Sequence, residues 1–99
     1  MRYALHMIIE FASKETEKIW QGEVSRKLPR DIQQVALRKL FMLDKAQVLN
    51  DLKIPPANRL EALKHDRKGQ YSIRINDQWR VCFVWTKNGP SAVEIVDYH

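Results

Sequence analysis

Residues 71–85, YSIRINDQWRVCFVW, constrain the fold more than any other stretch, because they predict two β-strands joined by a tight turn. The turn falls on Asn76-Asp77-Gln78, whose residue types tolerate a positive φ. It sets three apolar pairs on one face: Tyr71–Phe83, Ile73–Val81 and Ile75–Trp79. A slip of one residue would mix apolar and polar side chains, so this register is favoured. The opposite face carries Ser72, Arg74, Arg80 and Cys82. Two guanidinium groups make that polar face the first place to look for function.

Length and charge limit the alternatives. The 99 residues are expected to form one domain, 1–99, in which residues 1–6 are a possible extension before Met7. A net charge of +5 and a pI near 9.6 favour a polyanionic partner such as nucleic acid, the ribosome or an acidic protein. The single cysteine, Cys82, excludes an internal disulfide framework. No apolar run reaches the roughly 20 residues of a membrane span, and the first residues do not resemble a signal peptide. We therefore expect a cytoplasmic protein with no membrane contact.

The first half of the chain predicts a strand and two helices. Met7–Phe11 is expected to be a short strand. Ser13 is a suitable N-cap for a helix that ends near Gln21, before Gly22. Pro29 suits the first position of a longer helix. The apolar residues of that second helix recur at the spacing of one buried stripe: Ile32, Val35, Ala36, Leu40, Leu43 and Ala46 or Gln47.

The second half predicts a loop and three antiparallel strands. Residues 55–69 lack a strong periodicity and carry several cations, and we expect Leu60 and Leu63 to hold this loop to the core. The loop leads into the hairpin, and Ala92–Asp97 follows as a last strand. The order β, α, α, β, β, β predicts an α+β fold with two N-terminal helices packed on a small, twisted, mainly antiparallel sheet. The second face of the sheet is expected to be partly covered, which leaves Arg74 and Arg80 near a concave basic surface.

Familiar catalytic signatures are absent from the sequence. It has no glycine-rich phosphate loop, nucleophile elbow or paired cysteines. His6, His65 and His99 lack metal-ligand spacing, so neither a metal nor another cofactor is expected. Cys82 is expected to be a small inert core residue. What remains is a group of cations with a few titratable neighbours: Arg59, Glu61, Lys64, Arg67, Arg74, Arg80, Asp97, Tyr98 and His99.

Such a cluster suits RNA cleavage, because the 2′-hydroxyl of RNA attacks its own adjacent phosphorus and no protein nucleophile is required. The protein must deprotonate that hydroxyl, neutralise charge on the phosphoryl oxygens and protonate the leaving 5′-oxygen. Arginine binds phosphate in a bidentate manner and keeps its charge, and His99 beside the terminal carboxylate favours the imidazolium that a proton donor needs. Each candidate also has a plainer interpretation. The strand arginines are then solvated, Tyr98 caps the core, and His99 belongs to a frayed end.

The sequence also resembles a known family. The run NRLEALKHDRKGQYSIRINDQWRVCFVW at residues 58–85, followed by VEIVDYH at the end, is similar to the HigB-type toxins of the RelE/ParE superfamily. The resemblance implies a compact α+β toxin of a type II toxin–antitoxin pair that cleaves mRNA in the ribosomal A site. It also implies a HigA-like helix-turn-helix antitoxin that neutralises the toxin. The toxin is then expected to contact operator DNA only through this antitoxin.

The family's site residues carry over where this sequence matches them. Five residues are implied as catalytic: Lys64, Arg80, Asp97, Tyr98 and His99. Five more are expected to bind the substrate: Arg59, Glu61, Arg67, Arg74 and Gln78. Glu61 is a departure, because some members have histidine at its position and a carboxylate there repels phosphate; subtypes of the group do carry glutamate.

Two other functions remain open from the sequence. One is a ParE-like toxin that poisons gyrase, although the closing Asp-Tyr-His is against it. The other is a catalytically silent module that binds RNA or an antitoxin. Cleavage in a ribosome-programmed assay distinguishes the nuclease from both.

Overall fold

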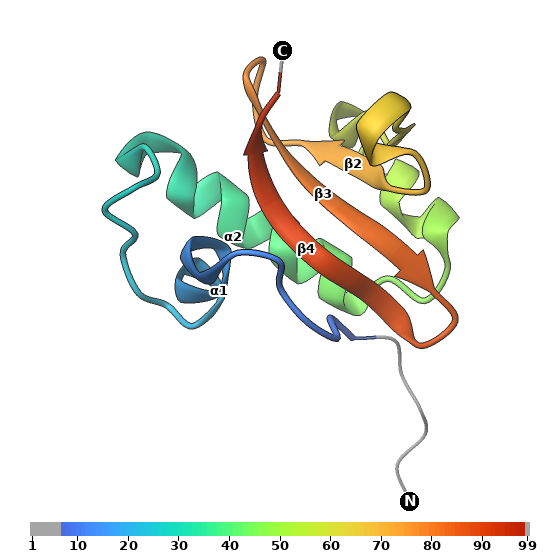
Figure 1. Ribbon diagram of the computed structural model, residues 1–99, viewed down its shortest axis with the longest axis horizontal. Coiled ribbons are helices and arrows are strands. Elements are labelled where there is room, and N and C mark those ends of the chain that lie inside the picture. Colours follow the sequence, from blue (N-terminus) through green and yellow to red (C-terminus); the bar gives the residue numbers. More distant parts are fainter. Residues whose placement is uncertain (1–6, 99) are drawn as a thin grey trace, which may run out of the picture.

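The computed structural model describes residues 7–98, so the possible extension at residues 1–6 and the predicted catalytic His99 lie outside the described residues. Within this range the chain forms two α-helices, three short 3-10 helices and one four-stranded antiparallel sheet with strand order β1-β2-β3-β4. The elements are α1 (Lys14–Trp20), α2 (Arg30–Lys45), η1 (Leu49–Lys53), η2 (Pro56–Asn58), β1 (Glu61–Ala62), η3 (His65–Arg67), β2 (Tyr71–Arg74), β3 (Trp79–Thr86) and β4 (Gly89–Asp97). Figure 1 shows α2 crossing behind the sheet. The predicted α+β class is confirmed.

The hairpin formed by β2 and β3 has the predicted register. Tyr71 lies opposite Phe83 and Ile73 opposite Val81. The side-chain oxygen of Asn76 closes the turn by accepting hydrogen bonds from the backbone N–H groups of Gln78 and Trp79, both at 2.8 Å. The apolar face of the hairpin meets the helices in one buried core, to which α1, α2, η1, the strands β2, β3 and β4 and two flanking residues, Ala46 and Ile75, contribute. Its residues are Ile19, Ile32, Ala36, Leu40, Leu43, Ala46, Leu52, Ile73, Ile75, Val81, Phe83, Val93 and Ile95.

Helix α1 begins and ends as its capping residues predict. The hydroxyl of Ser13 accepts a hydrogen bond from the backbone N–H of Thr16 at 3.0 Å, and Gly22 follows the last turn with φ +86°. Thr16 is fully buried, and its hydroxyl accepts the N–H of Ile95 at 2.9 Å. This bond fixes the helix to the outer edge of β4, where an unpaired N–H would otherwise remain.

Helix α2 starts one residue later than predicted, since Pro29 is its N-cap and Arg30 its first residue. It is an amphipathic helix whose apolar stripe enters the core. Of the described residues, no helix has the length and apolar character required to cross a membrane.

The predicted first strand at residues 7–11 is wrong as a strand, although the segment does lie against the sheet. Phe11 makes only an isolated parallel bridge with Val93. The backbone N–H of Ile9 donates to the Pro90 carbonyl at 2.8 Å, and that of Ala12 donates to the Val93 carbonyl at 2.9 Å. The chain then turns away into α1 after a few residues, which leaves too short a ladder for a strand.

The loop at residues 55–69 is more ordered than its aperiodic sequence predicts. It holds η2, η3 and the two-residue strand β1, which pairs with β2. Leu63 is buried and Leu60 half-buried, so the prediction that these two leucines hold the loop to the core is confirmed. Ser72 and Cys82, which belong to the polar face of the hairpin, are fully buried. That face is therefore covered in its middle.

Candidate active site

Arg80 is the centre of the candidate site. It lies on β3 directly opposite Arg74 of β2, and its side chain is only 12% exposed. The Nε–H group donates to the buried Ser72 hydroxyl at 2.6 Å, and an Nη2–H group donates to the backbone carbonyl of Arg59 at 2.5 Å. Two neutral acceptors from two different segments thus fix the plane of the guanidinium group while its positive charge remains available to an anion.

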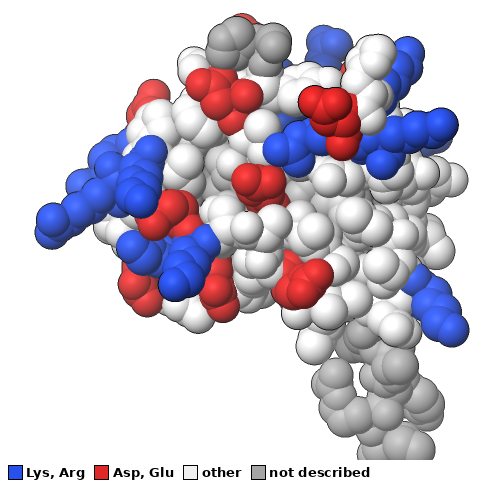
Figure 2. Space-filling model, viewed as in Figure 1, with Lys and Arg blue, Asp and Glu red and all other residues white. Residues whose placement is uncertain are grey.

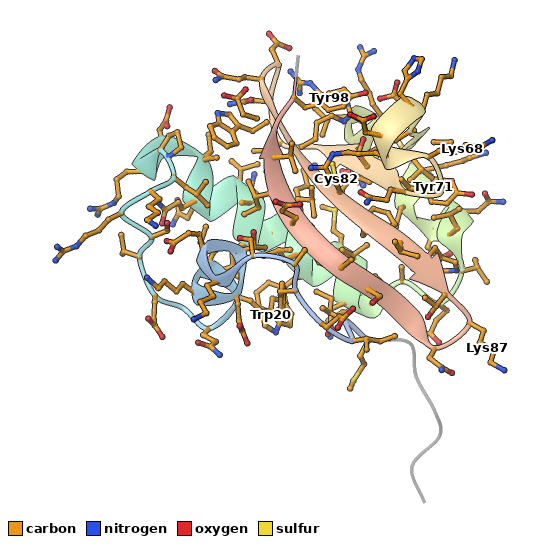
Figure 3. All side chains as sticks on the ribbon, in the orientation of Figure 1. Trp20, Lys68, Tyr71, Cys82, Lys87 and Tyr98 are labelled. Atoms are coloured by element: carbon orange, nitrogen blue, oxygen red, sulfur yellow. The ribbon has the colours of Figure 1, made fainter. Side chains whose placement is uncertain are left out.

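Two further predicted site residues lie against Arg80. A carboxylate oxygen of Glu61 lies 3.7 Å from Nη2, and its side chain is 51% exposed. The guanidinium carbon of Arg80 lies 5.9 Å from the centre of the Tyr98 ring, within the range of a cation–π contact. Figure 3 shows Tyr98 at the end of the sheet, well beyond the buried Cys82 in its middle. Arg80 therefore contacts both a carboxylate, which competes with an anion for its charge, and an aromatic ring, which carries no net charge.

A basic hollow opens beside Arg80. It has a volume of about 490 Å³ and is lined by Ala57, Arg59, Arg74, Asn76, Asp77 and Arg80. The carboxylate of Asp77 pairs with the Arg74 guanidinium at 2.6 Å, and this hydrogen bond together with the charge of Arg74 lowers the pKa of Asp77. The hollow collects three guanidinium groups around a single carboxylate, which is an arrangement suited to a phosphodiester.

A second hollow lies around Tyr98. It has a volume of about 380 Å³ and is lined by Leu63, Lys64, His65, Asp66, Arg67 and Tyr98. Arg67 is held in place by the Gln70 side chain at 3.0 Å and by Glu94 at 3.5 Å. Figure 2 shows blue basic side chains gathered at the upper right of the molecule, the region where η3 lies in Figure 1. An aromatic ring between cations can hold a nucleobase and its phosphates together.

Asp97, a predicted catalytic residue, lies at the end of β4 beside the turn of the hairpin. In the register of β3 and β4, Arg80 lies opposite Val96, whereas Asp97 lies opposite Trp79. Asp97 is therefore one residue out of register with Arg80. Its carboxylate accepts a hydrogen bond from Nε2 of Gln78 at 3.1 Å, and the Tyr98 N–H donates to the Gln78 carbonyl at 2.6 Å. Asp97 and Gln78 thus anchor the end of the chain beside Arg80.

Other chemistry finds little support in the described part of the chain. Within residues 7–98 no group of three or more His, Cys, Asp or Glu side chains is arranged to hold a metal ion. The Cys82 thiol is fully buried, and burial raises its pKa, which disfavours the reactive thiolate.

The sequence did not reveal the two groups that hold Arg80, which are the Ser72 hydroxyl and the Arg59 carbonyl. It also did not reveal the buried hydrogen bond between Lys39 and Asn58, the residue before Arg59. Alternation along β2 places Ser72 on the polar face, but it does not indicate that the loop buries this residue. No sequence signal joins Lys39 to a partner 19 residues further on.

The chain is similar in sequence to a known family and to two known proteins. The family model described as RelE-like toxin of type II toxin–antitoxin system HigB matches residues 9–99. The chain is 42% identical to Toxin HigB-1 of Vibrio cholerae serotype O1 over 80 residues, which is 80% of this chain and 84% of that protein. It is 39% identical to an uncharacterised protein of Haemophilus influenzae over 67 residues, 68% of this chain and 66% of that protein.

The fold, the basic site and the family match define the class of protein, a RelE-like toxin of a type II toxin–antitoxin system. Within that class the chain belongs to the HigB-like toxin family. Membership implies that a cognate antitoxin is its partner.

Proposed function

We propose that this toxin is an endoribonuclease that cleaves mRNA in the A site of the ribosome, in the cytoplasm where translation takes place. The observation that carries the proposal is the Arg80 guanidinium, which is held by Ser72 and the Arg59 carbonyl, lines the basic hollow beside Arg59 and Arg74, and contacts Tyr98. Preorganised charge of this kind stabilises a transition state in which negative charge develops on phosphate.

In the proposed reaction the 2′-hydroxyl loses its proton to a base, the 2′-oxygen attacks the adjacent phosphorus, and the bond from phosphorus to the 5′-oxygen breaks. The products are a 2′,3′-cyclic phosphate and a 5′-hydroxyl. Arg80 and Lys64 neutralise the phosphoryl oxygens. His99 acts as the general acid that protonates the leaving 5′-oxygen, with water accepting the proton of the 2′-hydroxyl, or in its neutral form as the base that accepts that proton, with water protonating the leaving oxygen. Tyr98 stacks on a base, and Asp97 orients the closing segment. The path of the RNA backbone is shaped by three other arginines, Arg59, Arg67 and Arg74, together with Gln78 and Glu61.

The ribosome supplies what the described site lacks. The Glu61 carboxylate lies 3.7 Å from Nη2 of Arg80, and the described residues in contact with Arg80 do not include an acid and a base placed together for proton transfer. A substrate that the ribosome holds in place removes much of the entropic cost of alignment. We further propose that a HigA-like helix-turn-helix antitoxin neutralises the toxin and carries it to operator DNA.

The test is a cleavage assay on ribosomes programmed with a defined mRNA, followed by mapping of the RNA 5′ ends. We expect Arg80→Ala to lower the cleavage rate by about 10²–10³-fold, as removal of one oriented transition-state donor typically does. Arg38→Ala is the matched control, because Arg38 is an exposed arginine on α2 and its loss changes the net charge equally. A chain ending at Tyr98 tests His99. Full cleavage by both Arg80→Ala and the shortened chain would contradict the assigned site, and damage to DNA with intact mRNA would indicate a gyrase poison instead.

A further inference from the structure

Lys39 is a buried cation that the proposed cleavage does not use. It lies on α2 beside the core residue Leu40 and is only 8% exposed. None of the ion pairs among residues 7–98 involves Lys39; its ammonium group donates instead to the side-chain oxygen of Asn58 at 2.6 Å. Burial, and to a lesser extent the positive charges of Arg38 and Arg74, lowers the pKa of Lys39. A cation that is costly to bury and has only an amide as its partner requires a reason for its position.

Asn58, the partner of Lys39, is itself fully buried at the end of η2. Its amide nitrogen donates to the Leu52 carbonyl at 3.1 Å and lies 3.7 Å from the sulfur of Met42. Its backbone N–H donates to the Pro55 carbonyl at 2.9 Å. The side chain therefore joins α2, η1 and η2, and its oxygen and nitrogen are both engaged.

The next residue, Arg59, connects the buried Asn58 to the Arg80 side chain. Its backbone is in the left-handed conformation, with φ 45° and ψ 57°, which is uncommon for a residue other than glycine and persists where the surroundings impose it. This conformation directs the Arg59 carbonyl to Arg80 at 2.5 Å, while its side chain lines the basic hollow. The turn lies between the anchor at Asn58 and the guanidinium of Arg80.

We infer that Lys39 and Asn58 are positioning residues for Arg80, because their buried hydrogen bond fixes the Arg59 turn whose carbonyl holds the guanidinium. The inference rests on the proposed function, in which Arg80 contacts the scissile phosphate. Neither side chain contacts the substrate. Lys39 fixes Asn58 to the rigid helix α2, Asn58 fixes the turn, and the turn sets the plane in which Arg80 presents its donors.

The test follows Arg80 directly in the full-length protein. The Nε–H group of Arg80 donates to a buried hydroxyl, so its ¹⁵N–¹H signal is expected to be sharp and resolved; its loss in Arg80→Lys assigns it. Lys39→Met removes the donor to Asn58 and keeps the apolar stem, whereas Asn58→Ala removes the whole anchor. Ile32→Val is the control, since it trims the same face of α2 without touching Asn58. Affinity is measured by anisotropy with a short RNA whose 2′-O-methyl groups prevent cleavage.

We expect both variants to shift or broaden the Arg80 Nε signal and to weaken RNA binding about three- to tenfold, which is the size of the effect of one ordinary hydrogen bond. The Ile32→Val control should leave signal and affinity unchanged. Lys39→Met keeps the test decisive if Asn58→Ala does not fold. A native Arg80 signal and native affinity in a folded Lys39→Met protein would overturn the inference and leave the pair as a structural clamp.

A failure of the proposed function gives a different result. In that case Arg80→Ala binds the RNA as tightly as the wild type, and the Nε signal of Arg80 still reports whether Lys39 and Asn58 position it.

Discussion

Replacing Glu61 by glutamine should strengthen the binding of RNA to the free protein. The Glu61 carboxylate lies 3.7 Å from Nη2 of Arg80. A bound phosphate would place its negatively charged oxygens beside the same guanidinium group. An incoming phosphodiester must displace this carboxylate or remain beside it, and both options cost free energy. Glutamine keeps the size and an acceptor oxygen but removes the charge, so the local packing is preserved.

The size of the gain follows from the exposure of the pair. Two unit charges 4 Å apart interact with about 1 kcal/mol in bulk water and about 4 kcal/mol at an effective dielectric constant of 20. Glu61 is half exposed, and pairs with exposed partners measure roughly 0.2–1 kcal/mol. A gain of about 0.5–1 kcal/mol corresponds to roughly two- to fivefold tighter binding, since about 1.4 kcal/mol is tenfold.

The assay is fluorescence anisotropy with a 2′-O-methyl RNA at low and at moderate salt, in the absence of ribosomes. Glu23→Gln is the control, because it removes one negative charge from an exposed position outside both hollows. The gain from Glu61→Gln over this control should shrink as salt is raised, because screening weakens interactions between exposed charges. Equal or weaker binding by Glu61→Gln relative to Glu23→Gln would refute the competition between Glu61 and phosphate.

Two further predictions concern the scaffold. Ser13→Ala removes the N-cap of α1 and should lower the free energy of unfolding by about 1 kcal/mol. For a domain of this size that loss lowers the melting temperature by roughly 4–8 °C. A Ser13→Asp variant that melts near the wild-type temperature would confirm the capping role, and an unchanged melting temperature of Ser13→Ala would contradict it. Cys82 is fully buried and burial raises its pKa, so a thiol reagent at pH 8 should label it only when the fold opens. Labelling of the native protein as fast as in denaturant would contradict this burial.

The elements that were predictable from the sequence are those set by local patterns. The hairpin register follows from two-residue alternation across a turn that Asn76 closes, and α1 follows from Ser13 and Gly22 at its two ends. Both patterns depend directly on backbone conformation, because side chains alternate along a strand and capping residues satisfy the free backbone groups at a helix end. The presence of Arg74 and Arg80 on one polar face was predictable for the same reason.

The supporting contacts of the site were not predictable, because they depend on the path of an aperiodic loop. Residues 55–69 place Arg59 and Glu61 beside Arg80, and Lys64 in the hollow around Tyr98, by way of η2, β1 and η3. No spacing rule indicates that the loop buries Ser72 or that Asn58 reaches Lys39. The prediction of a first strand at residues 7–11 was wrong for a related reason. Its apolar run is compatible with a strand, but the chain turns into α1 too soon to form a ladder of hydrogen bonds.

The donors of Arg80 explain how one side chain serves both the fold and a substrate. A guanidinium group has five N–H donors. Hydrogen bonds to the Ser72 hydroxyl and the Arg59 carbonyl engage two of them, and both acceptors are neutral, so the full positive charge is left for an anion. Three donors remain, enough for a bidentate contact with phosphate. Because the side chain is already fixed in place, less conformational entropy is lost on binding, and Glu61 is the one described contact of Arg80 that a phosphate has to replace.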